Sequence, residues 1–168
     1  MSRPEVWLRG AVPHVPALLQ PVAHSLLQCR EEIRAALSGL SNAHLVSRPG
    51  NAASVGYHAR HAMGSLDRLF TYARGEQLSD AQRATLAAEA DQTQPADAAE
   101  LIAAFDAAVE RALAQLRSTA EATLLEPREV GRARLPSTVL GLLFHAAEHT
   151  QRHVGQLVTT AKVVRERT

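Results

Sequence analysis

The chain has 168 residues, of which 46% are hydrophobic and 21% charged, with 18 basic residues against 17 acidic ones. This length suits one domain over residues 1–168 with a core that needs no disulfides, and the single cysteine, Cys29, excludes an intramolecular disulfide framework. Balanced charge and 4% aromatic residues argue against nucleic-acid binding. We find no secretory leader and no run of about 18 apolar residues, so we expect a cytoplasmic protein that does not cross a membrane.

The first half of the chain predicts helices, because it lacks sustained alternation of β-branched residues and is rich in helix-forming ones. A first helix is expected from about Pro16 to Leu37, with Pro21 either kinking it or moving its start later. Its apolar face would consist of Leu18, Leu19, Val22, Leu26, Ile33 and Leu37. The stretch from Gly39 to Ala53 is interpreted as a connecting loop.

A second helix is predicted from about Ser54 to Arg74, ended by Gly75. Its apolar stripe comprises Val55, Ala59, Ala62, Leu66, Leu69 and Ala73. The segment Ser79 to Gln82 matches a capping box, which predicts a short extra helix from Asp80 to Glu89.

A third long helix is expected from Asp97 to about Thr119, with Leu101, Phe105, Val109, Leu113 and Leu116 on one face. The polar stretch from Glu121 to Pro136 is interpreted as a connection without regular structure. Ser137 is expected to cap a last helix that runs to about Arg165. Four long amphipathic helices in one domain predict an all-α four-helix bundle.

Histidine carries the strongest chemical signal, because five of the eight histidines lie in two clusters. The last helix contains His145, His149 and His153, and residues four apart lie about 40° apart around a helix. Two such imidazoles can bind one metal ion. The buried stripe is expected to hold Val139, Leu142, Ala146, Leu157, Thr160 and Val164. His153 falls near its centre, His149 on its edge and His145 further out, which favours His149 with His153 as a metal-binding pair.

A third ligand could come from the second helix, which offers His58 and His61. Periodicity places His58 slightly closer to the apolar stripe, and it does not decide between the two. The alternative is that the histidines are hydrogen-bonded core residues or exposed polar ones. Two histidines on a buried stripe favour a metal, because each buried ring needs partners for both nitrogens.

Two segments resemble one known family. They are S-V-G-Y-H-A-R-H-A-M-G-S from Ser54 to Ser65 and E-H-T-Q-R-H-V-G-Q-L from Glu148 to Leu157. Together they resemble the DinB-like, or YfiT-like, superfamily of metal-dependent four-helix proteins. His61 with Ser65 matches the family's first motif, and the second is matched by His149, His153, Gly155 and Gln156. Many relatives have His-His-Arg before Gly-Gln. This chain has Arg152, His153 and Val154 there, and the difference is expected to change the wall of the pocket.

The resemblance implies a site for a divalent metal ion, zinc or nickel before other ions, formed by His61, His149 and His153. It also implies up-down-down-up connectivity and a homodimer. The favoured activity is transfer of a low-molecular-weight thiol to a small electrophilic substrate, with the metal holding the thiolate. The alternatives are a metal-dependent hydrolase and a non-catalytic metal- or ligand-binding stress-response protein, in which His58 or His145 would close the metal site as a fourth ligand.

Other residues near the motifs are assigned supporting or structural roles. Candidates for the pocket or for contacts behind the ligands are His58, Ser65, His145, Gln156, Tyr57 and Arg60. Gly155 is expected to let another helix approach closely, and Glu148 to pair with Arg152 four residues on. Asp67 and Arg68 are expected to form surface or interhelical ion pairs. Cys29 is expected to be a small buried residue rather than a nucleophile.

Overall fold

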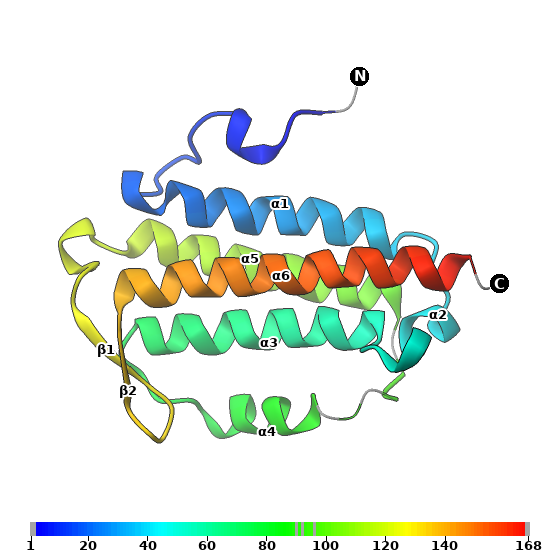
Figure 1. Ribbon diagram of the computed structural model, residues 1–168. Coiled ribbons are helices and arrows are strands. Elements are labelled where there is room, and N and C mark those ends of the chain that lie inside the picture. Colours follow the sequence, from blue (N-terminus) through cyan, green and yellow to red (C-terminus); the bar gives the residue numbers. More distant parts are fainter. Residues whose placement is uncertain (1–2, 90, 92, 96, 167–168) are drawn as a thin grey trace.

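The computed structural model describes residues 3–89, 91, 93–95 and 97–166, and four long helices lie side by side in it (Figure 1). They are α1 (Gln20–Leu37), α3 (Val55–Ala73), α5 (Ala98–Ser118) and α6 (Val139–Arg165). Both α5 and α6 pack against α1 and α3. Figure 1 shows α1 and α6 running in one direction and α3 and α5 in the other. The predicted all-α bundle and its up-down-down-up connectivity are confirmed.

The apolar stripes read from the sequence form the core of the bundle. All five stripe residues of α5 and all six of α6 are buried, and the buried apolar side chains make one connected cluster. Leu69 of α3 is half-buried, and Leu18 lies outside the core, because 61% of it is exposed. It lies in a single 3-10 turn, Ala17–Leu19, that precedes α1, and the tighter turn takes it out of phase with the helix. None of the described helices has the length and apolar character needed to cross a membrane.

Helix α3 begins and ends where its sequence signals predict. Ser54 accepts a hydrogen bond from the backbone N–H of Tyr57 at the first turn. At the other end Gly75 has φ 79°, a left-handed conformation that glycine adopts without steric cost, and the N–H of Glu76 returns to the carbonyl of Thr71. This closure fixes the length of α3 and the position of its histidines.

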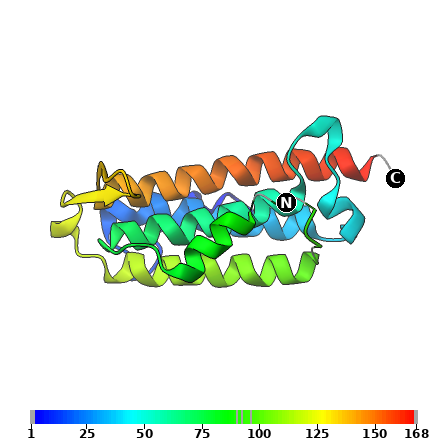
Figure 2. The same ribbon diagram turned by 90° about the horizontal axis from the view of Figure 1, so that it is seen from below.

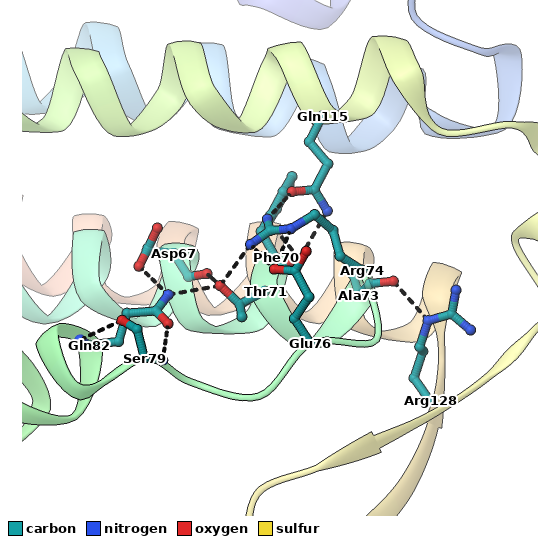
Figure 3. A network of polar contacts seen from close by, with 10 residues as sticks. All are labelled: Asp67, Phe70, Thr71, Ala73, Arg74, Glu76, Ser79, Gln82, Gln115 and Arg128. Carbon is teal, nitrogen blue, oxygen red and sulfur yellow. Dashed lines mark hydrogen bonds and ion pairs between the residues drawn. The ribbon is translucent and has the colours of Figure 1, made fainter.

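The last turn of α3 is held by a network of polar side chains from neighbouring elements (Figure 3). Gln115 of α5 donates to the Phe70 carbonyl at 2.9 Å and accepts from Arg74 at 2.6 Å. Arg128 donates from Nε to the Ala73 carbonyl at 2.8 Å. Cationic side chains are favourable at a helix C-terminus, where carbonyl groups lack partners within the helix.

The short extra helix predicted after α3 is present as α4 (Asp80–Ala88), with the reciprocal capping box between Ser79 and Gln82. It lies outside the four-helix arrangement, against α3 (Figures 1 and 2). The Gln82 amide nitrogen also donates to Asp67 Oδ2 at 2.6 Å and to Thr71 Oγ1 at 2.8 Å, both on α3. The first turn of α4 is thereby fastened to the C-terminal half of α3.

The interpretation of residues 39–53 as a loop is wrong in part. A five-residue helix, α2 (Asn42–Val46), lies within it, followed by a 3-10 turn at Pro49–Asn51. Ser41 caps α2, because its side chain accepts from the N–H of His44 while the His44 ring accepts from the N–H of Ser41. Neither apolar periodicity nor helix propensity signals so short an element, and the cap uses a histidine where the usual box has Glu or Gln.

The stretch before α6, expected to lack regular structure, contains a two-stranded antiparallel hairpin, β1 (Pro127–Val130) and β2 (Leu135–Thr138). Four-residue strands that each contain a proline are too short to show alternation. Ser137 belongs to β2, opposite Arg128. The cap of α6 is therefore Thr138, which accepts from the N–H of Gly141 at 3.0 Å, and not the predicted Ser137.

Candidate metal centre

The site lies where α3 packs antiparallel against α6, near the middle of both helices. His61 from α3 and His149 and His153 from α6 each offer one ring nitrogen, and these three nitrogens lie within 4.8 Å of one another. His61 Nε2 and His149 Nε2 lie 3.1 Å apart. Nitrogens that each lie about 2.0–2.1 Å from a tetrahedral zinc ion are separated by a little more than 3 Å, so this spacing suits a shared ion.

A buried carboxylate supports the ring of His61 from behind. His61 Nδ1 lies 2.8 Å from Glu89 Oε2, at the C-terminal end of α4. A carboxylate only accepts, so the imidazole donates from Nδ1, and the neutral ring then has its lone pair on Nε2. That nitrogen faces His149. A metal-binding histidine almost always donates its second nitrogen to such a partner.

His58 occupies the equivalent position behind His153. Their Nδ1 atoms lie 3.0 Å apart, so one of them donates to the other. His58 is 6% exposed, as the periodicity of α3 predicts, but it does not join the three converging nitrogens. Depth in the bundle was therefore a poor guide to which histidine of α3 faces the other two.

The surroundings of His58, His149 and His153 favour the neutral form of these three rings. Burial, with the nearby His61 and His149, lowers the pKa of His153 to about 4. Burial also lowers the pKa values of His149 and His58, and the neighbouring His61 adds to both shifts. Neutral imidazoles with free lone pairs are the form in which histidine binds metal.

The other candidate residues surround this centre unevenly. The ring of Tyr57 stacks on that of His61, with centroids 5.5 Å apart and planes 8° from parallel. Ser65 is buried one turn after His61. His145 is exposed, with its ring centroid 5.5 Å from that of His149, and Gln156 is also exposed.

Arg60 lies on the outer side of α3. It lines a cavity of about 260 Å³ together with Gly64, Glu89, Gln94 and Arg111. Its Nη2 is buried and has no hydrogen-bond acceptor among the described residues. Burial lowers the pKa of Arg60.

Four structural assignments made from the sequence can be checked directly. Glu148 pairs with Arg152, and Cys29 is buried, both as predicted. Arg68 forms the expected interhelical ion pair, with Glu89, whereas Asp67 accepts from an uncharged amide. Within the described chain no helix approaches Gly155 closely, because a Cβ at that position would meet no atom within 4 Å.

A model of the DinB superfamily matches residues 25–157, a span that begins within α1, includes α3, α4, α5 and most of α6, and leaves out the N-terminal turns. This chain belongs to the DinB superfamily. Comparison with curated proteins gave no match. Membership and the three converging histidines agree with a metal-dependent DinB protein.

Glu89 is the residue of this DinB site that the sequence motifs did not reveal. It had one local signal: it ends α4, where the helix dipole disfavours a negative charge. An acidic residue at that position indicates a partner elsewhere in the fold. Which partner it meets depends on how α4 crosses α3, and no motif states that.

Proposed function

We propose that this DinB protein is an enzyme that binds one divalent metal ion, zinc or nickel, through His61, His149 and His153. The observation that carries the proposal is the convergence of three imidazoles with Glu89 behind one of them. Imidazole suits several first-row ions, zinc and nickel among them. When bound, such an ion supplies a positive centre that stabilises a thiolate or lowers the pKa of water.

The number of ligands favours an open, catalytic site over a closed, structural one. Among the described residues, no fourth histidine, cysteine or carboxylate joins the three nitrogens. His58 and His145, which could have closed the site, lie behind His153 and on the surface. Structural zinc sites take four protein ligands, whereas catalytic sites take three and keep a position for substrate.

The favoured reaction is transfer of a low-molecular-weight thiol to a small electrophile. Three neutral ligands leave the ion its full charge, which favours an anionic sulfur ligand at the open position. The chain's own thiol does not supply that sulfur, because Cys29 is buried and packs on the α1 side of α6, near Gln151. Hydrolysis by metal-bound hydroxide is the second candidate, since the same open position accepts water.

Metal content decides the first part of the proposal. Tag-free protein is analysed by plasma mass spectrometry beside His153→Ala, with His24→Ala of α1 as the matched control. We expect close to one metal ion per chain in the parent and the control, and loss in His153→Ala. No metal in the parent after incubation with zinc or nickel would contradict the proposal.

Turnover decides the second part. The metal-loaded protein is tested with glutathione and 1-chloro-2,4-dinitrobenzene for thiol transfer, and with p-nitrophenyl acetate for hydrolysis. Metal-dependent thioether formation supports the transferase, whereas metal-dependent ester cleavage alone supports the hydrolase. Stoichiometric metal without turnover of further thiols, electrophiles and esters would favour a non-catalytic binding protein.

We also propose that the protein forms a homodimer through the open side of α1 and α6. Three cavities of about 460, 330 and 450 Å³ follow this pair of helices, and adjoining ones share Gln151 or Glu32. Along α6 their walls include Glu148, Gly155 and Lys162. Glu148 and Lys162 lie seven residues on either side of Gly155, so an antiparallel crossing of two α6 helices there would place opposite charges face to face.

The dimer is tested by sedimentation velocity on the parent and on Val158→Glu, with Thr159→Glu beside it as the control. A dimer that only Val158→Glu converts to a monomer supports this surface. A monomeric parent at micromolar concentration would contradict it.

A further inference from the structure

Glu89 joins the candidate metal centre to a second charged residue of α3. Its carboxylate accepts from His61 Nδ1 at 2.8 Å through Oε2, and from Arg68 Nη1 at 2.5 Å through Oε1. Arg68 Nη2 also reaches Oε2, at 3.2 Å. Both partners lie on α3, seven residues apart, and the Glu89 side chain is only 6% exposed. The carboxylate is therefore fixed on both sides by side chains that are themselves held on one helix.

This arrangement keeps Glu89 negatively charged. The guanidinium of Arg68, which stays protonated in proteins, pairs with both oxygens of the carboxylate through Nη1 and Nη2. A negatively charged acceptor makes the hydrogen bond to His61 stronger than one between neutral groups. The His61 ring therefore has one favoured tautomer and one favoured orientation, with Nε2 towards His149.

Gly64 provides the space in which the carboxylate sits. A Cβ on Gly64 would lie 2.2 Å from Glu89 Oε1 and 2.7 Å from Arg68 Nη1. His61, Gly64 and Arg68 follow one another at spacings of three and four, and so lie on the same side of α3. Glycine in a helix interior is destabilising relative to alanine, so a compensating contact is expected where it occurs. Here that contact is the approach of Glu89.

The other two histidines of the centre are supported differently. His153 faces the imidazole of His58, and among the described residues no carboxylate accepts a hydrogen bond from His149 or His153. Glu148, next to His149 in sequence, is paired with Arg152 instead. Among the described residues, Glu89 is thus the carboxylate that accepts a hydrogen bond from one of the three candidate metal ligands. It comes from the end of α4, outside the four-helix arrangement.

We propose that Glu89 is a positioning residue for metal binding, which fixes the tautomer and orientation of His61 while Arg68 holds the carboxylate and Gly64 leaves room for it. This inference rests on the proposed metal site. It gives α4 a function beyond connecting α3 to α5, namely to deliver one carboxylate to the back of the site.

The test is metal affinity, measured on tag-free protein by competition with a chromophoric zinc chelator. For Glu89→Gln we expect affinity about 10- to 100-fold below that of the parent, the range for loss of an outer-shell partner. The visible spectrum of the cobalt-substituted protein is expected to change as well, because the field at His61 changes. Glu148→Gln, the same chemical change beside His149, is the control and should stay within about twofold.

Two further variants separate positioning from folding. Gly64→Ala changes no charged group, yet it should lower affinity by displacing Glu89, whereas Gly155→Ala near His153 should not, because nothing lies within 4 Å of its Cβ. The double variant Glu89→Gln with Arg68→Gln removes the unpaired arginine that the single variant leaves. If Glu89 positions His61, the double variant should still bind metal weakly. Recovery of parental metal affinity would mean that the loss in Glu89→Gln came from the unpaired Arg68.

The outcomes distinguish this inference from the proposal on which it rests. If the parent binds no metal, the proposed function fails and the role of Glu89 fails with it. If the parent binds metal and both Glu89→Gln and Gly64→Ala bind it within twofold of the parent, the positioning role is overturned while the metal site stands. Circular dichroism of each metal-free variant confirms that the comparison is made between folded proteins.

Discussion

The two halves of α3 carry two clusters of polar side chains. The clusters differ in whether their hydrogen-bonding atoms all have partners within the chain. In the C-terminal half, the carbonyls of Phe70 and Ala73 are matched by donors from Gln115 and Arg128, and the cluster is complete within the chain (Figure 3). In the N-terminal half, the hydrogen-bond partners of His61 and His153 lie behind the rings, Glu89 as an acceptor and His58 as a second imidazole, so that the other ring nitrogens converge on a common point. The first cluster stabilises the bundle. The second has a surplus of acceptors, which is the property that a cation requires.

Helix α4 contacts both clusters. Its first turn meets the cluster that is complete within the chain, and its end meets the cluster that includes the candidate metal ligands. Gln82 in its first turn donates to Asp67 and Thr71 beside the completed network. Glu89 at its end meets His61 and Arg68 beside the histidines. One short helix thereby connects the structural half of α3 to the half that carries the site.

The largest expected effect is on zinc affinity, and it should follow a substitution in the histidine cluster but not one in the other cluster. His149→Ala should lower zinc affinity more than about 100-fold, beyond the range for outer-shell residues, because it removes one of three ligands. Gln115→Ala, in the other cluster, should bind zinc as the parent does. Chelator competition measures both, and equal losses in the two variants would mean that the clusters are not functionally distinct.

Metal binding should also stabilise only the protein with an intact histidine cluster. An ion that binds the folded state alone adds about 2.7 kcal/mol to the free energy of unfolding when free metal is 100 times Kd. Urea unfolding with and without zinc should show this increment in the parent and in Gln115→Ala, but not in His149→Ala. An increment retained by His149→Ala would place the bound ion elsewhere.

Loss of one contact in the completed network should cost stability alone. Gln115→Ala or Arg128→Ala removes a donor to the last carbonyls of α3, and we expect each to lower the free energy of unfolding by about 1 kcal/mol. Urea unfolding of the metal-free proteins measures the change. A loss of zinc affinity in either variant would show that the C-terminal half of α3 supports the site.

Gln82→Ala tests the connection between the two halves. It removes the capping box of α4 and two hydrogen bonds to α3, for an expected cost of about 1 kcal/mol. Hydrogen exchange should quicken in α4, and zinc affinity should fall by less than in Glu89→Gln, since the carboxylate remains. Unchanged exchange in α4 would show that Glu89 alone holds this helix.

The smallest effect is expected at Cys29, which lies on the α1 side of α6 and belongs to neither cluster. Burial raises the pKa of its thiol to about 12. The folded protein should therefore react slowly with iodoacetamide even at about pH 9, where the thiol of an unfolded chain, with a pKa of about 8.5, is ionised. Rapid alkylation of the folded protein would contradict this, and Cys29→Ala should leave thiol transfer unchanged.

The sequence by itself determined the four long helices, their buried faces and the histidines that could bind metal. These features follow from local rules, because apolar spacing and helix caps depend on neighbours within a few residues. It did not determine the hairpin before α6 or the short α2, whose elements are too brief for a periodic signal.

Helical phase did not decide which histidine of α3 faces α6; the family motif favoured His61, and only the tertiary structure shows what lies behind it. His58 and His61 lie on the same side of the buried stripe, with His58 slightly closer to it, so helical phase alone leaves both open. The packing of α3 on α6 brings His61 to His149. Glu89 reaches His61 because α4 folds back along α3, with Gly64 at the point of closest approach. Contacts between residues 28 positions apart in the chain depend on the path of the backbone, which local sequence patterns do not specify.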